Sequence, residues 1–182
     1  MKASTFAKKI RALKPDRSFL AARDLPEEFI EELRSSYDIL PRERRAGYSS
    51  ELAELVNNYT AKGFELFSIT FKGETARQNG RLAFANMELD ELAINLQDGK
   101  VKLFSFETGE PLYECAADGE TFMDALYEMA RIVADRIQKE EFTDPCADAV
   151  RLAQLSGLPA SVAFYRWVLN CEESAPLGRV PS

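Results

Sequence analysis

Four short segments of alternating apolar and polar residues follow one another closely in the middle of the chain. They span residues 81–87, 91–97, 100–106 and 111–116. Parallel strands need a connection of about a dozen residues or more, so strands this close together can pair only in antiparallel fashion. Asp98 and Gly99 lie between two of the segments and favour a type I′ turn, which needs a positive φ at both central residues. The sequence therefore predicts an antiparallel sheet.

A further strand and the surrounding helices complete the predicted fold. Residues 64–71 are rich in Phe, Ile and Thr and predict a strand, whereas residues 72–80 predict a polar loop with two glycines. A longer turn is predicted around Gly109, and helical periodicity appears on both sides of this block. We therefore expect an α+β fold with a central antiparallel sheet of about five strands flanked by helices, extended by a C-terminal helical hairpin.

The N-terminal segment is basic, whereas the rest of the chain is acidic. Residues 1–17 carry a net charge of +5, which leaves −12 for the remainder of a chain whose net charge is −7. Phe6, Ile10 and Leu13 fall on one face of a helix that Pro15 ends. We interpret this segment as a short helix docked by its apolar residues. The alternative is a basic amphipathic arm that touches a membrane or nucleic acid.

Two more helices are predicted before the sheet. Asp24 can cap the first one, and Pro26 suits its first turn. The buried stripe of this helix is expected to hold Phe29, Ile30, Leu33 and Tyr37. Ser49 or Ser50 can cap the second helix, and Gly63 ends it. Its apolar positions are Leu52, Leu55, Val56 and Tyr59.

Three helices are predicted after the sheet. Thr121 can cap a long helix whose apolar residues recur at helical spacing and should cover one face of the sheet. Those residues are Phe122, Leu126, Met129, Val133 and Ile137. Asp144 and Pro145 open a shorter helix that ends at Gly157. Pro159 lies at the start of the last helix.

The length of 182 residues suits one ordinary domain with short extensions. We expect a basic N-terminal arm at 1–17, an α+β domain at 18–140, a helical hairpin packed on it at 141–171, and a flexible tail at 172–182. No apolar run approaches the length of a membrane span, and no signal peptide pattern is present. A cytoplasmic location is therefore expected.

Residue usage argues against catalysis. The chain contains no histidine, which removes the commonest general base and the commonest metal ligand. Neither a G-x-S-x-G nor an S-x-x-K signature occurs. Cys115, Cys146 and Cys171 are far apart and form no C-x-x-C pair, so we interpret them as reduced thiols. We expect no catalytic residue, no metal site and no cofactor, and hence a protein that is not an enzyme.

A metal-dependent nuclease is one alternative. Glu88, Asp90 and Glu91 precede the segment Asp98-Gly99-Lys100, and such nucleases combine carboxylates that hold magnesium with a lysine near the attacking water. However, turn formation is a sufficient explanation for Asp98.

A DNA-binding protein is the second alternative. Residues 149–168 resemble a helix-turn-helix unit, with Ala153 and Gly157 at the small-residue and turn positions. The second helix offers only Arg166 as a cation, and DNA binding depends on neutralising phosphates. An ordinary helical hairpin packed on the domain is therefore the preferred interpretation.

A family resemblance covers about residues 19–137. Leu25 and Pro26 precede an amphipathic helix, a hairpin around Asp98 and Gly99 follows in the sheet, and a capped helix then carries Phe122 near its start. In this order the three features resemble the SUKH superfamily, which includes bacterial immunity proteins and fungal cell-wall regulators. The resemblance implies a protein that acts by binding other proteins, commonly toxins, and not by catalysis.

The acidic body agrees with this implication, because opposite charges steer two proteins together. The expected partner is a protein such as a basic toxin or nuclease, nucleic acid is not expected as a partner, and the sequence assigns no oligomeric state. The expected partner-binding residues are Glu88, Asp90, Glu91, Asp98, Phe104 and Phe106.

The two aromatic residues of this set leave two interpretations open. Alternation points Phe104 and Phe106 to one face of their strand and Val101 and Leu103 to the other. A helix covers the aromatic face in the first interpretation. In the second, the aromatics form an exposed patch with an acidic rim, a composition typical of an interface.

Overall fold

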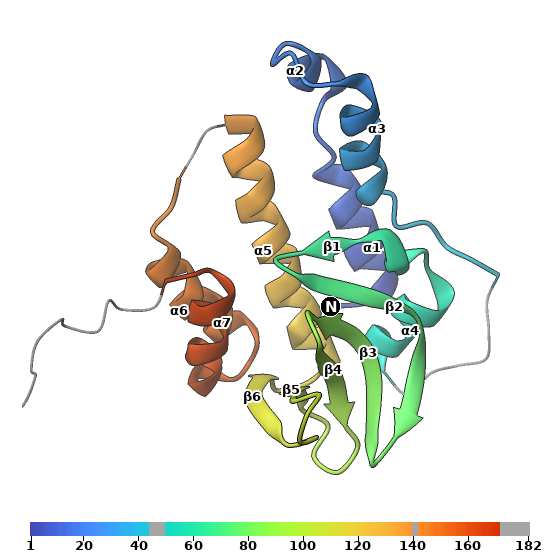
Figure 1. Ribbon diagram of the computed structural model, residues 1–182, viewed down its shortest axis with the longest axis vertical. Coiled ribbons are helices and arrows are strands. Elements are labelled where there is room, and N and C mark those ends of the chain that lie inside the picture. Colours follow the sequence, from blue (N-terminus) through green and yellow to red (C-terminus); the bar gives the residue numbers. More distant parts are fainter. Residues whose placement is uncertain (44–49, 140–141, 172–182) are drawn as a thin grey trace, which may run out of the picture.

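Within the described residues, six strands form an antiparallel sheet at the centre of the structure (Figure 1). The computed structural model describes residues 1–43, 50–139 and 142–171, so the expected tail lies outside it. Each strand pairs with the next one along the chain, which makes the sheet a simple meander. The strands are β1 (Glu65–Leu66), β2 (Ile69–Gln78), β3 (Arg81–Met87), β4 (Asp90–Asn95), β5 (Val101–Phe104) and β6 (Pro111–Ala116). The predicted α+β class is confirmed.

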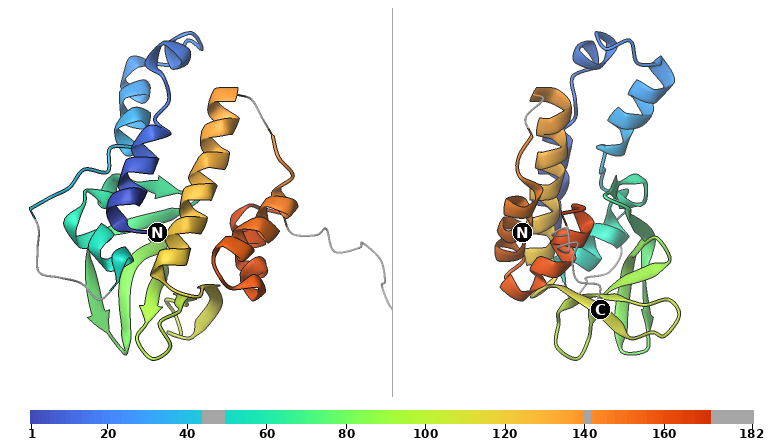
Figure 2. Two further views of the ribbon diagram at one scale, coloured as in Figure 1. Left: turned by 180° about the vertical axis from the view of Figure 1, so that it is seen from behind. Right: turned by 60° about the vertical axis from the view of Figure 1, so that its left-hand side comes forward.

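Three helices cover one face of this sheet, which we call the inner face (Figure 2). They are α1 (Ala3–Ala12), α4 (Glu51–Asn58) and α5 (Gly119–Lys139). One core cluster joins all three helices to the sheet. Aromatic rings run through it: Phe6 contacts Phe64 with ring centroids 6.1 Å apart, and Phe84 contacts Phe122 at 5.6 Å. The long helix therefore covers one face of the sheet, as predicted.

The predicted apolar stripes of α1 and α5 both contribute to this core. Phe122, Leu126 and Met129 of α5 are fully buried. Phe6 and Ile10 of α1 are also fully buried, and they belong to the same core cluster as the sheet. The basic N-terminal segment thus forms a helix that is packed into the core, with its lysines on the exposed side.

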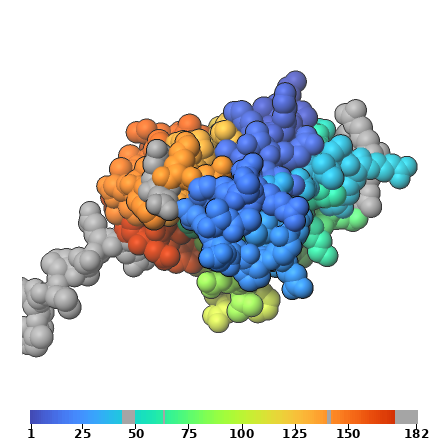
Figure 3. All heavy atoms as spheres, turned by 90° about the horizontal axis from the view of Figure 1, so that it is seen from above, coloured from blue at the N-terminus to red at the C-terminus, as the bar shows by residue number. Residues whose placement is uncertain are grey.

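Two short helices, α2 (Arg17–Ala21) and α3 (Glu27–Ser36), project away from the sheet (Figures 1 and 3). The stripe predicted for α3 is only partly correct, because Ile30 is buried whereas Phe29 is 49% exposed. Helix α3 packs mainly on the short helix α2, and this neighbour is too small to cover both Phe29 and Ile30. Asp24 does not cap α3, and it adopts a φ of 54° in the turn before it.

The C-terminal hairpin packs on β6 and α5, as the sequence predicts. It consists of α6 (Pro145–Leu155), a 3₁₀ turn (Pro159–Ser161) and α7 (Val162–Val168). The Tyr165 hydroxyl donates a hydrogen bond of 3.0 Å to the carbonyl of Cys115 in β6. The rings of Tyr113 and Trp167 stack with centroids 5.7 Å apart. These contacts cover the edge strand β6 with helical side chains.

Residues 64–71 do not form the single strand that their composition predicts. The chain reverses at Phe67 and Ser68, which have φ values of 48° and 65°, and β1 pairs with β2 across this turn. Neither residue is Gly or Asn, the usual signal for positive φ, so the turn is invisible in the sequence. Strand β2 then continues through most of the segment predicted as a loop, up to Gln78.

The turn between β4 and β5 also differs from the prediction. Only Gly99 of the Asp98-Gly99 pair has a positive φ, at 75°, so the turn is not of type I′. The Gly99 N–H donates to the carbonyl of Asn95 at 2.8 Å, which makes a longer turn. Asp98 supports this turn through its carboxylate, which accepts from the Lys100 N–H at 3.0 Å.

Two helix caps can be compared with the sequence predictions. Ser50 caps α4 by accepting from the Ala53 N–H at 3.2 Å, whereas Ser49 lies outside the described residues. At the start of α5, the Asp118 carboxylate accepts from the Thr121 N–H at 2.7 Å, and the Thr121 hydroxyl accepts from the Asp118 N–H. Asp118 is therefore the cap, and Thr121 completes a reciprocal pair with it.

Candidate functional site

Opposite the inner face lies the outer face of the sheet, which the three covering helices leave open (Figure 2). Because side chains alternate along each strand, residues between core positions point to this outer face. A small apolar cluster of Ala83, Ala93 and Phe104 lies at its centre. The polar and charged residues around that cluster are Lys72, Arg81, Glu91, Asn95, Lys102 and Glu114.

The Arg81 side chain covers the centre of the outer face. Its guanidinium lies over the Phe104 ring, 4.3 Å from the centroid, and its Nη1 donates to the carbonyl of Gly109 at 3.3 Å. The Nε atom is 3.4 Å from the Glu91 carboxylate. Glu91 also accepts from Lys72 Nζ at 2.8 Å and from the amide of Gln78 at 3.2 Å. Arg81 thus fills the place that a helix fills on the inner face.

A second charged network lies near the turn between β4 and β5. Lys102 Nζ is 2.7 Å from the Asp98 carboxylate and 3.4 Å from Glu114, which also pairs with Lys100 at 2.9 Å. Burial would raise the pKa of Asp98, but hydrogen bonds from Lys102 and from the Lys100 N–H hold that pKa below its usual range. The hydrogen bond from Lys100 lowers the pKa of Glu114. The Asp98 and Glu114 carboxylates are therefore ionised near neutral pH.

Two hollows open on the outer face, and they share Arg81 and Gly109. The first has a volume of about 380 Å³ and is lined further by Lys72, Asn86, Leu89 and Phe106. The second has a volume of about 360 Å³ and extends past Phe104 toward Asn95 and Lys102. They meet where the loop at residues 105–110 folds back over the sheet and contacts Arg81.

Two large apolar side chains are exposed beside the first hollow. Leu89, in the turn between β3 and β4, is 77% exposed, and Phe106, in the loop between β5 and β6, is 72% exposed. Asp90 joins the two loops, because its carboxylate accepts from the Phe106 N–H at 3.0 Å. We call Leu89, Phe106 and the exposed acidic residues of the same loops, Glu88, Glu107 and Glu110, the loop-end patch.

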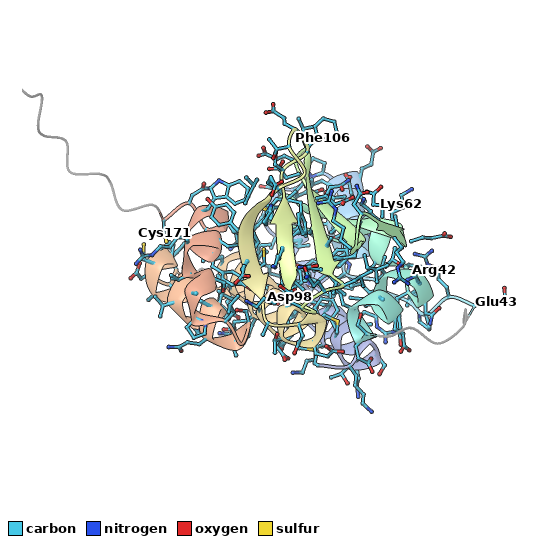
Figure 4. The ribbon with its side chains drawn as sticks, turned by 90° about the horizontal axis from the view of Figure 1, so that it is seen from below. Arg42, Glu43, Lys62, Asp98, Phe106 and Cys171 are labelled. Atoms are coloured by element: carbon cyan, nitrogen blue, oxygen red, sulfur yellow. The ribbon has the colours of Figure 1, made fainter. Side chains whose placement is uncertain are left out.

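The predicted site residues fall into three separate places. Glu88, Asp90 and Phe106 lie together at the end of the sheet that carries the turn between β3 and β4 and the loop between β5 and β6. Glu91 and Phe104 lie on the outer face under Arg81, and Phe104 is buried. Asp98 lies at the other end of the strands from Phe106 (Figure 4). The structure therefore does not bring all six residues into one surface.

The two aromatic residues differ in their surroundings, and the expected helical cover is found over neither. Phe104 is covered, but by the Arg81 side chain and not by a helix. Phe106 is exposed, with acidic residues on its loop. The two residues separate because β5 ends at Phe104 and the following loop folds back toward Arg81.

Sequence reasoning missed Leu89 and Arg81. Leu89 belongs to a two-residue turn, since Met87 pairs directly with Asp90, and an apolar residue at such a turn cannot reach the core. An apolar residue in a predicted turn between two strands could therefore have identified Leu89 as an exposed apolar side chain. No comparable signal marks Arg81. Its position over Phe104 depends on a hydrogen bond to Gly109, which lies 28 residues further along the chain.

The residues proposed for a metal-dependent nuclease are not assembled. Glu88 and Asp90 lie at the loop end, whereas Asp98 and Lys100 lie at the opposite end of the sheet. Among residues 1–43, 50–139 and 142–171, no group of three or more Cys, Asp or Glu side chains is arranged to hold a metal ion. The nuclease hypothesis therefore gains no support from the geometry.

The helix-turn-helix hypothesis gains no support either. In the second helix of the hairpin, Phe164 and Tyr165 are fully buried, and Tyr165 is hydrogen-bonded to β6. A recognition helix needs an exposed face with several polar or basic side chains to enter the major groove. Within α7, Arg166 is the one basic residue.

Comparison with known proteins gives no match to a family model, to a curated protein or to a solved structure. The likeness to the SUKH superfamily therefore stays a prediction from residue patterns. In the part of the chain that the structure describes, no helix combines the length and the apolar composition of a bilayer-crossing segment.

Proposed function

We propose that this chain is a non-catalytic protein-binding module, and specifically an immunity protein that inhibits a basic toxin. The observation that supports this proposal most strongly is the loop-end patch. Leu89 and Phe106 are largely exposed, and both line the same hollow of about 380 Å³. Large apolar side chains that gather on a surface mark interaction sites more often than single exposed ones do.

The composition of the loop-end patch suits a basic protein surface. An aromatic anchor surrounded by polar residues is the usual arrangement of an interface hot spot. Glu88, Glu107 and Glu110 have exposed carboxylates, and the described ion pairs do not include them. The net charge of −7 extends the attraction beyond direct contact. The adjacent hollow can accept a side chain from the partner.

Two groups that could serve in catalysis are held in unreactive states. Burial raises the pKa of the Cys115 thiol far above its usual range, so the nucleophilic thiolate is scarce. Burial also raises the pKa of Tyr165, whose hydroxyl is used to hold the hairpin on β6. Both residues therefore act in packing, which agrees with a binding role.

The proposal is tested with toxins encoded beside the gene for this chain. Each candidate toxin is produced in a sensitive host with and without the chain, and growth and direct binding are measured. We expect rescue of growth and a stable complex. The double variant Leu89→Ser/Phe106→Ser should weaken binding about 100-fold or more, since hot-spot residues contribute about 2 kcal/mol or more each.

A matched control uses an equally exposed pair elsewhere. Phe29 is 49% exposed and Leu40 is 45% exposed, and neither residue lines a hollow of the outer face. The variant Phe29→Ser/Leu40→Ser should bind the toxin like the wild type. Equal loss in both double variants, or full binding by Leu89→Ser/Phe106→Ser with the fold intact, contradicts the assignment of this surface.

Charge reversal separates steering from contact. The triple variant Glu88→Lys/Glu107→Lys/Glu110→Lys should slow association with a basic partner about tenfold at low salt, with a smaller effect at high salt. An association rate that is unaffected by this change contradicts a basic partner. In parallel, binding to duplex DNA at about 150 mM salt should be weaker than micromolar. Tighter binding with a steep salt dependence would favour the DNA-binding alternative.

A further inference from the structure

Two thiols that are far apart in the sequence meet at the open end of the C-terminal hairpin. Cys146 is the second residue of α6, and Cys171 follows α7. The Sγ atom of Cys146 lies 3.1 Å from the carbonyl oxygen of Cys171. Cys171 lies at the outer side of the hairpin in Figure 4, away from the sheet. The hairpin thus brings its first and last turns together through these two residues.

The Cys146 thiol also affects the Cys171 thiol electrostatically. Burial raises the pKa of the Cys171 thiol to about 11, and the neighbouring Cys146 thiol contributes to this increase. A thiol has such an effect only over a short distance, so this observation agrees with the contact between Cys146 and the Cys171 backbone. The third cysteine, Cys115, is fully buried in β6 and donates to the carbonyl of Tyr113 in its own strand.

We propose that Cys146 and Cys171 form a reversible intramolecular disulfide when the protein meets a small-molecule disulfide such as oxidised glutathione. Cys146 is only partly buried, whereas Cys171 is buried. Cys146 is therefore the thiol that the small molecule reaches first, and Cys171 is the one that completes the bond. This site is independent of the loop-end patch and of the function proposed for it.

The chemistry balances in two exchange steps. The Cys146 thiol loses its proton, and its sulfur attacks one sulfur of oxidised glutathione, whose S–S bond breaks and releases one glutathione that takes up a proton. The Cys171 thiolate then attacks the Cys146 sulfur and displaces the second glutathione. The two cysteines lose two electrons and two protons in total, and oxidised glutathione gains them as two thiols.

The disulfide would close the hairpin at its open end, between the start of α6 and the residues that follow α7. Helix α7 has seven residues, and after it the Cys171 N–H donates to the carbonyl of Arg166 at 3.0 Å. The new bond would link positions 25 residues apart and would prevent α7 from separating from α6. Because α7 covers β6, the oxidised form should also protect the sheet edge against local opening.

The test treats the full chain with oxidised glutathione and follows it by intact mass and peptide mapping. We expect a loss of two hydrogen atoms and one disulfide between Cys146 and Cys171, reversed by dithiothreitol. Trypsin should cut after Arg166 about tenfold more slowly in the oxidised protein, because cleavage needs local opening of α7. An oxidised protein that is cut as fast as the reduced one contradicts the locking of the hairpin.

Three single variants assign the roles of the cysteines, each checked for an unchanged circular dichroism spectrum. Cys115→Ser should form the disulfide like the wild type. Cys171→Ser should stop at a glutathione adduct on Cys146, and Cys146→Ser should stay unmodified over the same period. A bond that involves Cys115, equal adducts in the last two variants, or no intramolecular bond in the wild type overturns the proposal.

Discussion

The two faces of the sheet carry the same strands but are covered in different ways. On the inner face, three helices supply apolar side chains, and the contact is built from rings and aliphatic groups such as Phe84, Phe122 and Leu126. On the outer face, the charged side chain of Arg81 covers Phe104, which belongs to a small apolar cluster. Apolar contacts need many neighbours to exclude water, whereas a long charged side chain can cover apolar surface and keep its charge near solvent.

Under the proposed function, the inner face supplies stability and the outer face and its loops supply the binding surface. The inner face holds most of the buried apolar residues and should determine whether the chain folds. The outer face keeps two hollows, which are lined by long charged side chains such as Arg81 and Lys102. Leu89 and Phe106, the two most exposed large apolar residues in the loops between the strands, lie at one end of this open face. Substitutions on the two faces can therefore be compared directly.

The largest effect is expected on the inner face. Leu126→Ala should lower the free energy of unfolding by about 2–5 kcal/mol, because it removes a fully buried side chain and leaves a cavity. The matched substitution Leu89→Ala, at a 77% exposed leucine, should change it by less than about 0.5 kcal/mol. Urea unfolding of both variants measures the contrast. Similar losses in the two variants would mean that α5 does not cover the sheet as described.

A smaller effect is expected at the centre of the outer face. Arg81→Ala should cost about 1–3 kcal/mol, because it uncovers Phe104 and leaves the Glu91 carboxylate, 16% exposed, with fewer partners. Arg81→Met should cost less, since its aliphatic chain can still cover the ring. Urea unfolding again provides the measurement. If Arg81→Met lowers the free energy of unfolding as much as Arg81→Ala does, the charge of Arg81 contributes more to stability than its cover of the Phe104 ring.

A still smaller effect is expected where the two loops meet. Asp90→Ala should cost about 1 kcal/mol, because the Phe106 N–H loses its acceptor. Glu88→Ala, in the adjacent exposed position, should be neutral within about 0.5 kcal/mol. Hydrogen exchange at the Phe106 amide gives a local readout. An amide that exchanges equally fast in Asp90→Ala and in the wild type would show that this hydrogen bond does not order the loop.

The smallest effect concerns the ion pairs near Asp98. The hydrogen bond from Lys100 lowers the pKa of Glu114 from its ordinary value of 4.5, so its contribution to stability is complete above that pH. This contribution is lost as the pH falls through the lowered pKa. The Glu114 side chain is 40% exposed, so solvent screening keeps the contribution below about 0.5 kcal/mol.

Thermal unfolding of Glu114→Gln across the acidic range provides the measurement for this last prediction. The small difference from the wild type should be present near about pH 6 and should vanish in acid. A difference that grows on acidification has the wrong sign for a carboxylate with a lowered pKa, and it would mean that Glu114 is not stabilised by its lysine partners.

Local sequence signals were sufficient for the main elements of the fold. Short spacing between alternating segments forces antiparallel pairing, and this holds for β3 to β6. The helical spacing of Phe122, Leu126 and Met129 identified the stripe of α5 that is buried. These features depend on residues that are close in the chain, so the pattern alone contains the needed information.

Local signals failed where a conformation depends on distant contacts. Phe67 and Ser68 adopt positive φ although neither residue favours it, because the surrounding core holds β1 against β2. Phe29 was expected inside and is exposed, because α3 projects beyond the sheet. The conformation of the Phe67–Ser68 turn and the exposure of Phe29 are therefore set by the packing around these segments and not by their own sequences.

For the candidate site, the sequence by itself determined the chemical types and approximate location: acidic residues and aromatics around the central strands. Only the tertiary structure decided that Phe104 is covered by Arg81, that Phe106 stands exposed beside Leu89, and that Asp98 lies at the far end. It also decided that Cys146 and Cys171 meet. The physical reason is the same in each case. These residues are brought together by loops and helices whose positions depend on tertiary packing, and the local spacing of apolar residues does not predict those positions.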